Sequence, residues 1–352
     1  MNLLRVHRLI NDAIRTFSLD LNGLRILTEA ATGYYALTPL IAALAGAERV
    51  YALTRDSCYG PATKVRDDTM ELAHCWGVTD RIEVFCSRDD PRIKDADIVT
   101  NLGFVRPLDA NFLRRLKPTS VISMMWEAWE YRPEDLDLGE CRRLGIPVLG
   151  TNEHYPDLQT FGYIGLLALK LLFALDIEVY RCNIVILGSG EFCRITAATL
   201  QSEGARVIVA DPGLEGVLKT ERIQEALQIA DAIVIVEHRN RKMFIGPRGD
   251  ISAEELHAIN PALAVAHICG GVDRYSLGAV GLRCYPDRFA APGYMSLATD
   301  YLGPKPLVDL HAAGLKVGEL MWHKKQVLND AKQIEQILAE EHSLCQCLTQ
   351  EG

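Results

Sequence analysis

VILGSGEFCRITAATLQSEGARVIVAD, residues 185–211, is the stretch of this 352-residue sequence that decides the fold. It begins as a short apolar strand, turns at Gly188 and Gly190, continues as a helix, and ends in a second apolar strand closed by Asp211. These are the parts of a βαβ unit that binds a dinucleotide. The sequence therefore predicts a parallel sheet with a nucleotide site at this turn.

Each residue of the turn suits such a site. Gly188 permits the tight turn, Gly190 lets backbone amides approach a pyrophosphate, and the helix from about Glu191 directs its positive end at the phosphates. Cys193 stands where the third glycine is usual, and it is small enough for the helix to pack closely on the strand. The carboxylate of Asp211 would bind both ribose hydroxyls and repel a 2′-phosphate, so we expect NAD rather than NADP.

The residues predicted to contact the cofactor lie in this turn and directly after strands of the same unit. They are Gly188, Ser189, Gly190, Glu191, Phe192, Asp211, Pro212, His238, Ile268 and Cys269. A second interpretation stays open, in which the domain has the same fold but an altered pocket.

The rest of the chain repeats the alternation of strand and helix. Strands are expected at 24–30, 49–55, 81–87, 96–102, 120–126 and 146–151, and then at 183–188, 206–211, 232–238 and 264–269. Such alternation predicts parallel sheets covered by helices on both faces. We therefore predict an α/β protein with two doubly wound parallel-sheet domains joined by long helices.

The length of the chain also favours two domains, because single cores usually stop growing below this size. The expected hinge is NEHYPD, residues 152–157. Residues 1–155 would form the first domain, completed by a C-terminal helix over 315–352. Residues 156–314 would form the nucleotide-binding domain.

Composition and charge indicate a small-molecule ligand. Apolar residues make up 49% of the sequence and charged residues 24%, which is typical of globular proteins. The net charge of −9 disfavours a nucleic-acid partner, because phosphate binding needs a basic face. The most apolar stretch, residues 163–177, is too short to span a bilayer and contains Lys170 and Asp176. We expect neither a nucleic acid nor a membrane as partner.

The ten cysteines lack CxxC spacing, and the N-terminus resembles an amphipathic helix rather than a signal peptide. A reducing, cytoplasmic location is therefore expected. Cys345 and Cys347 form a single CxC, and no nearby pattern supplies the other ligands that zinc requires. No metal site is expected.

Several stretches resemble the D-isomer-specific 2-hydroxyacid dehydrogenases, the formate and glycerate dehydrogenase-like family. The likeness runs through DADIVTNLG (95–103), DLGECRRLGIPV (137–148), VILGSG (185–190), ADAIVIVEH (230–238) and INPALAVAHICGGVD (259–273). It covers roughly residues 95–275. The resemblance implies a flavodoxin-like substrate domain ahead of an NAD-binding Rossmann domain, and a homodimer formed through the nucleotide domains.

The resemblance also implies where a substrate binds. Backbone amides of Asn101, Leu102 and Gly103 would hold its carboxylate, with Arg106 close by. The family's chemistry uses an arginine to orient the keto acid, a histidine to pass the proton and an acid beside that histidine. This sequence departs from the pattern, because Cys269 aligns with the arginine and cannot replace a guanidinium as a carboxylate clamp.

Other residues are therefore candidates for the chemistry. His238 and His267 stand at or just after the carboxyl ends of strands, and Glu127 follows the strand at 120–126, so these three are the predicted catalytic residues. Asn152 in the hinge and Tyr294 in the loop at 287–296 are predicted to contact substrate. For each of them, a packed or solvated side chain without a chemical role is the alternative.

Three functions agree with these observations. The first is an NAD-dependent oxidoreductase acting on a small anionic hydroxy or keto compound, with non-standard residues moving the proton. The second is an enzyme similar to adenosylhomocysteine hydrolase, with tightly bound NAD. The third is a non-catalytic NAD-binding sensor or assembly protein.

Overall fold

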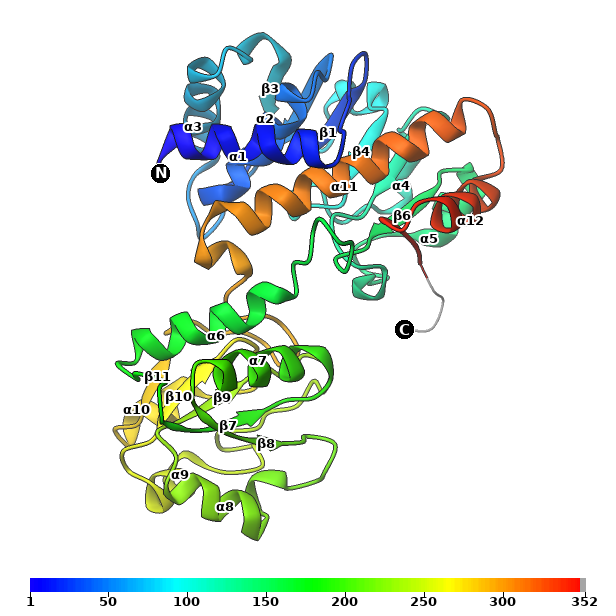
Figure 1. The fold of residues 1–352 in the computed structure, drawn as a ribbon. Coiled ribbons are helices and arrows are strands. Elements are labelled where there is room, and N and C mark those ends of the chain that lie inside the picture. The colour runs from blue at the N-terminus through cyan, green and yellow to red at the C-terminus, as the bar shows by residue number, and fades with distance from the viewer. Residues whose placement is uncertain (349–352) are drawn as a thin grey trace. The chain divides into compact units, whose positions relative to one another are not determined.

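The chain divides into two units in a computed structural model that describes residues 1–348 (Figure 1). Unit 1 comprises Met1–Gln159 and the segment from Pro304 onward, and unit 2 comprises Thr160–Gly303. Each unit is built on one sheet, of seven strands in unit 1 and five in unit 2. The predicted α/β class with two doubly wound sheets is confirmed.

The strands of unit 1 are β1 (Arg25–Glu29), β2 (Arg49–Leu53), β3 (Ile82–Phe85), β4 (Ile98–Thr100), β5 (Val121–Ser123), β6 (Val148–Thr151) and β12 (Cys345–Cys347). Their order in the sheet is β12-β6-β5-β4-β1-β2-β3. All pairs are parallel except β12 with β6. Compared with a five-stranded flavodoxin-like sheet, this sheet therefore has two additional strands, β3 outside β2 and β12 beyond β6.

The helices of unit 1 are α1 (Leu3–Thr16), α2 (Leu37–Leu44), α3 (Ala62–Cys75), α4 (Ala110–Leu113), α5 (Leu138–Leu144), α11 (Pro304–Lys325) and α12 (Ala331–Glu341). Short 3₁₀ turns occur at Gly33–Ala36, Thr79–Arg81, Pro91–Asp95 and Ala128–Glu130. Alternate strand residues face opposite layers. Ile26 and Val50 pack in the core under α1, α2 and α11, whereas Leu27 and Tyr51 pack in the core with α4 and α5 residues.

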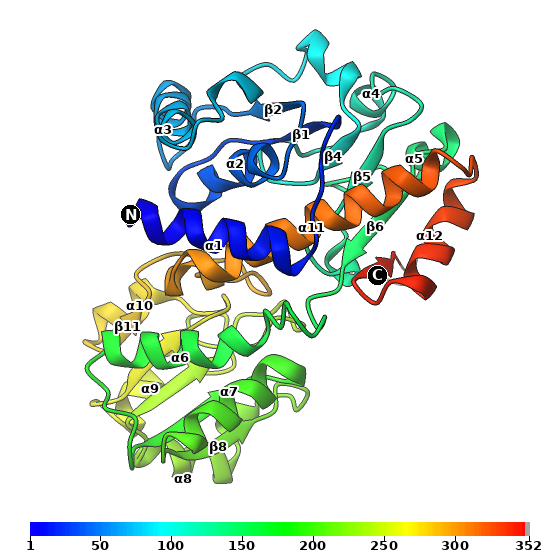
Figure 2. The same cartoon turned by 45° about the horizontal axis from the view of Figure 1, so that its top comes forward.

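Helix α11 crosses this sheet beside α1, as Figure 1 and Figure 2 both show. Two glycines one turn apart permit the close approach. A Cβ on Gly314 would lie 2.7 Å from the sulfur of Met125, and one on Gly318 would lie 2.5 Å from a methyl group of Ile98. A larger residue at either position would push the helix off the strands.

The C-terminal segment differs from the single helix expected from the sequence. α11 ends at Lys325, and α12 begins after Asp330, whose side chain caps it by accepting from the amide of Gln333. β12 then pairs with the edge strand β6. Residues 304–314, expected in the nucleotide domain, are the first half of α11 and lie in unit 1, as do residues 156–159.

The strands of unit 2 are β7 (Asn183–Leu187), β8 (Arg206–Ala210), β9 (Ala232–Ile235), β10 (Ala264–His267) and β11 (Arg283–Tyr285), all parallel, in the order β11-β10-β9-β7-β8. Its helices are α6 (Gly162–Ala174), α7 (Gly190–Ser202), α8 (Glu221–Gln228), α9 (Ala253–Ile259) and α10 (Arg274–Ala279). Two 3₁₀ turns occur at Val217–Lys219 and Thr299–Leu302. Helices α6 and α7 pack on one face of the sheet, and helices α8, α9 and α10 pack on the other.

No helix within residues 1–348 is long and apolar enough to cross a membrane. Over the same residues, no group of three or more His, Cys, Asp or Glu side chains is arranged to hold a metal ion. All ten cysteines are free thiols.

Candidate functional site

The glycine turn between β7 and α7 has the backbone that the sequence predicts. Gly190 is the first residue of α7 and has a φ of +60°, a left-handed conformation that other residues rarely adopt. A Cβ on Gly188 would lie 2.5 Å from a methyl group of Val236, so only glycine fits there. Ser189 is the N-cap residue but makes no side-chain capping hydrogen bond. The first amides of α7 therefore keep their capacity to bind an anion.

Glu237 joins this turn to the loop after β9. Its carboxylate is fully buried and accepts hydrogen bonds from the Ser189 hydroxyl at 2.7 Å and from the amides of Arg239 and Asn240 at 2.7 and 2.8 Å. β7 and β9 are neighbours, yet the chain leaves β7 for β8 on one side and reaches β9 on the other. The hydrogen bonds of Glu237 thus lie at the switch point of the sheet, where α/β proteins commonly bind ligands.

A guanidinium group lies over the same turn. A Cβ on Gly190 would come within 2.9 Å of Cζ of Arg239, whose side chain is exposed. An anion at the N-terminus of α7 would therefore meet a positive charge as well as the backbone amides. Sequence analysis missed both Glu237 and Arg239. The signal for Glu237 was an acid directly after the buried run 232–236.

Asp211 follows β8 and is exposed. Its Oδ1 accepts a hydrogen bond from the amide of Gly213 at 2.9 Å, which fixes the turn, and Pro212 beside it is buried. Glu191 forms an ion pair with Arg194 on the surface of α7, at 2.9 Å.

The two candidate histidines of unit 2 have different surroundings. His238 is half-buried and lies against Phe192, with ring centroids 4.2 Å apart, and burial lowers the pKa of its imidazole. His267 is 2% exposed, and its ring nitrogens interact with the hydroxyl of Ser296 at 2.6 Å and the carbonyl oxygen of Pro286 at 2.9 Å. Burial also lowers the pKa of His267. Only His238 combines a strand end with partial exposure.

The segment after β10 is covered by residues 290–295. Ile268 and Cys269 are both completely buried, and burial raises the pKa of the Cys269 thiol well above its usual range. The amide of Gly270 donates to the carbonyl oxygen of Tyr294 at 2.8 Å, and the Tyr294 ring is partly exposed. Cys269 therefore offers no open surface for a ligand.

In unit 1, three buried side chains connect the carboxyl ends of β1, β4, β5 and β6 in order. Glu29 accepts from the amide of Phe104 at 2.8 Å, and Oδ1 of Asn101 accepts from the amide of Met125 at 2.9 Å. Glu127 accepts from the amide of Glu153 at 2.7 Å. β1 and β4 flank the switch point of this sheet, which is where α/β proteins commonly bind ligands.

The loop after β4 contains the predicted substrate residues. Leu102 is buried in the core, whereas Gly103 and Arg106 are partly exposed. Nη1 of Arg106 forms an ion pair with Asp135 at 2.6 Å, and its guanidinium lies 5.0 Å from the ring centroid of Trp126. Nε of Arg106 is buried and has no hydrogen-bond partner within residues 1–348.

Asn152 has a structural role in the same unit. Its Nδ2 donates to the carbonyl oxygen of Ser343 at 2.7 Å, and its Oδ1 accepts from the amide of His154 at 3.0 Å.

In the same unit, burial and the carboxylates of Glu153 and Glu127 raise the pKa of Glu130 to about 8.

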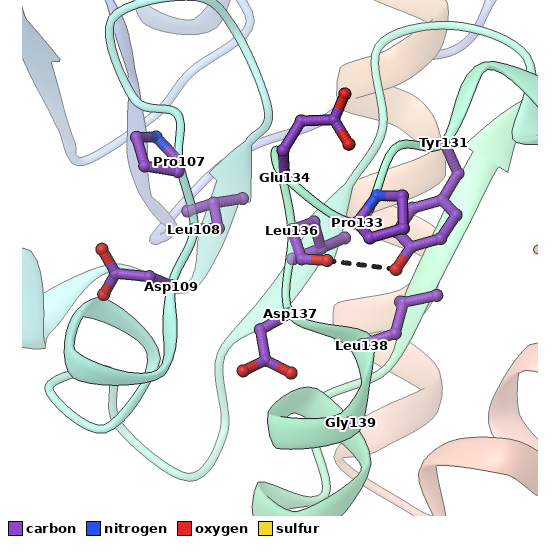
Figure 3. A pocket seen from close by; sticks show the side chains of 10 residues that line it. All are labelled: Pro107, Leu108, Asp109, Tyr131, Pro133, Glu134, Leu136, Asp137, Leu138 and Gly139. Atoms are coloured by element: carbon purple, nitrogen blue, oxygen red, sulfur yellow. Dashed lines mark hydrogen bonds between the residues drawn. The ribbon is translucent and has the colours of Figure 1, made fainter.

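A separate cavity of about 280 Å³ lies between the loop before α4 and the segment before α5 (Figure 3). It is lined by Pro107, Leu108, Asp109, Tyr131, Pro133, Glu134, Leu136, Asp137, Leu138 and Gly139. Two of its acids cap helices, since Asp109 accepts from the amide of Phe112 and Asp137 from that of Glu140. No predicted site residue lines it.

Nine of the predicted residues lie in two groups. Gly188, Ser189, Gly190, Phe192 and His238 gather at the switch point of unit 2. Asn101, Gly103, Arg106 and Glu127 lie at the carboxyl edge of the sheet in unit 1.

No protein-family model and no curated protein sequence matches this chain. A dipicolinate synthase from Bacillus subtilis aligns over 88% of this chain and 99% of its own, at 14% identity and a TM-score of 0.52. The dipicolinate synthase from Bacillus halodurans covers 83% and 96%, at 11% identity and a TM-score of 0.50. A 2-hydroxyacid dehydrogenase from Ketogulonicigenium vulgare covers 87% and 95%, at 12% identity and a TM-score of 0.45.

At these identities the likeness is one of fold. A 2-hydroxyacid dehydrogenase and a glyoxylate reductase are among the distant structural neighbours. Over most of its length, the chain has a fold similar to that of the two dipicolinate synthases, with TM-scores of 0.52 and 0.50.

Proposed function

We propose that this protein is an NAD-dependent oxidoreductase acting on a small anionic hydroxy or keto compound. The observation that carries the proposal is the turn at Gly188–Gly190, which combines a left-handed glycine, an N-cap side chain turned away from the helix amides, and Arg239 above the turn. Each part favours a diphosphate, and a dinucleotide is the diphosphate that this fold commonly binds.

The residues present fit NAD in particular. Asp211 offers an exposed carboxylate at the end of β8, where it would bind the hydroxyls of the adenosine ribose. The same charge disfavours the 2′-phosphate of NADP. When bound, NAD would supply a hydride acceptor or donor.

His238 is the proposed proton-transfer residue of unit 2. It follows β9, and its lowered pKa keeps the imidazole neutral near neutral pH. A neutral imidazole accepts the proton of a hydroxyl group as that group is oxidised. The contact with Phe192 fixes the ring. The homodimer and the cytoplasmic location implied above stay predictions.

A second candidate is a protein that binds NAD without redox turnover. It is favoured by the burial of Cys269, which stands where the family's arginine is expected, and by the engagement of both nitrogens of His267. Of the two candidate histidines in unit 2, only His238 would then stay available for proton transfer.

The test is a titration of the purified chain with NAD, followed by absorbance of the reduced nicotinamide with a panel of 2-hydroxy and 2-keto acids. We expect binding and turnover, and His238→Ala should lower kcat much more than it changes KM. His257 provides the matched control, because it lies on α9 and is not among the predicted site residues. His257→Ala should therefore leave both kcat and KM unchanged. Binding without turnover of any acid would favour the second candidate, and no binding would refute both.

A further inference from the structure

The loop after β4 places Gly103 between two opposite charges. A Cβ placed on Gly103 would have two heavy atoms within 4 Å, Oε2 of Glu29 at 3.4 Å and Nη2 of Arg106 at 3.9 Å. The two side chains come from different elements, since Glu29 ends β1 and Arg106 follows β4. They do not form an ion pair with each other, so each keeps capacity for another partner.

The guanidinium of Arg106 has one edge without a hydrogen-bond acceptor within residues 1–348. Its single hydrogen bond within residues 1–348 is from Nη1 to Asp135, and Trp126 lies against its face. Nε and Nη2 form the edge that binds a carboxylate through two parallel hydrogen bonds. Nε is buried without a partner, and Nη2 is beside Gly103. A buried donor without an acceptor costs free energy, and a bound carboxylate would remove that cost.

Glu29 supplies the opposite charge. It is 5% exposed, and its hydrogen bond from the amide of Phe104 fixes Oε2 beside Gly103. A buried carboxylate needs more than one donor to offset its lost hydration. An ammonium group can donate to Glu29 while a carboxylate of the same small molecule accepts from Arg106.

We propose that this edge of unit 1 binds a small carboxylic acid that also carries an ammonium group, with the carboxylate on Arg106 and the ammonium on Glu29. The proposal rests on the proposed function for its reaction, and it narrows the substrate from any small hydroxy or keto acid to an amino-substituted one. A phosphate fits less well, because it would bring up to two negative charges beside Glu29.

Serine and glycerate provide matched probes, since they differ only in an ammonium or hydroxyl group at the second carbon. Each racemate is titrated calorimetrically into the full chain. We expect serine to bind the unaltered protein about tenfold or more tightly than glycerate. Glu29→Gln keeps an oxygen for the Phe104 amide but removes the charge, so it should abolish the preference for serine. Arg106→Gln should weaken both ligands, and Arg106→Lys should weaken them less.

Arg92 is the control, because its guanidinium is engaged with Asp90 and Glu83 on every nitrogen. Arg92→Gln should leave both affinities unchanged. Equal binding of serine and glycerate, no binding of either, or a serine preference that survives Glu29→Gln would overturn the proposal. NAD affinity is measured separately. If the unaltered protein did not bind NAD but still preferred serine, the proposed function would be refuted and this inference would stay supported.

Discussion

The carboxylate of Glu237 holds the hydroxyl of Ser189 at 2.7 Å, and this hydrogen bond joins the β7–α7 turn to the loop after β9. The same carboxylate accepts two amides of its own loop. A fully buried carboxylate is tolerated when such donors replace water, so the three bonds explain why an acid stands at the end of an apolar strand. The turn at Gly188–Gly190 is thus fixed by contacts within unit 2 itself.

Removing this carboxylate should affect both stability and cofactor binding. Glu237→Ala leaves three donors without their acceptor, so the free energy of unfolding should fall by about 1–3 kcal/mol. The affinity for NAD should fall as well, because the turn loses its connection to the neighbouring loop. Urea unfolding and an NAD titration measure the two effects. Glu225→Ala, an exposed change on α8, should alter neither. Unchanged NAD affinity in Glu237→Ala would show that the hydrogen bonds of Glu237 do not shape the proposed nucleotide site.

Arg239 should contribute positive charge at the proposed nucleotide site, because its guanidinium lies over Gly190. Arg239→Gln should lower NAD affinity about tenfold, because hydrogen bonds to charged groups contribute roughly 1.5–3 kcal/mol. The loss should shrink as salt concentration rises, since the side chain is exposed. The control is Arg194→Gln, which removes an exposed arginine of α7 that pairs with Glu191. Equal losses in the two variants would assign the effect to net charge rather than to the position over Gly190.

Asp211 should set the choice between NAD and NADP. Asp211→Ala removes the carboxylate that would repel a 2′-phosphate, so the ratio of the Kd for NADP to that for NAD should fall by about tenfold or more. Calorimetric titration of both nucleotides gives this ratio directly. Glu203→Ala, which removes an exposed acid just after α7, should leave the ratio unchanged. An unchanged ratio in Asp211→Ala would remove Asp211 from the nucleotide site.

Much of the fold was predictable because local signals agreed with it. The alternation of apolar strands with helices predicted two parallel sheets, and glycines at 188 and 190 predicted the turn now seen with its left-handed Gly190. The break between α11 and α12 was missed, because apolar spacing continues through both helices and only Asp330 marks the new start. β12 was missed as well, since three residues show no period and its pairing with β6 is long-range.

The candidate site was less predictable, because its contacts join residues far apart in the sequence. Their positions after strands identified Asn101, Glu127 and His238 as candidates. These positions did not predict whether each side chain faces outward or hydrogen-bonds a neighbouring loop. His267 shares that sequence position and has both nitrogens engaged. The opposite charges beside Gly103 come from Glu29 and Arg106, 77 positions apart in the chain, which no local pattern could connect.

His311 should make the stability of the protein depend on pH. It is buried on α11 beside the hydroxyl of Thr38 at 2.7 Å, and burial lowers its pKa to about 3. The unfolded chain therefore binds this proton at higher pH than the folded chain does, so stability is full above a pH of about 6.5 and declines as pH falls toward the folded value. His311→Asn should lower stability at neutral pH yet flatten its decline under acid, measured by urea unfolding across that range. His7→Asn, at a partly exposed position on α1, should keep the slope. An equally steep decline in His311→Asn would contradict the assignment.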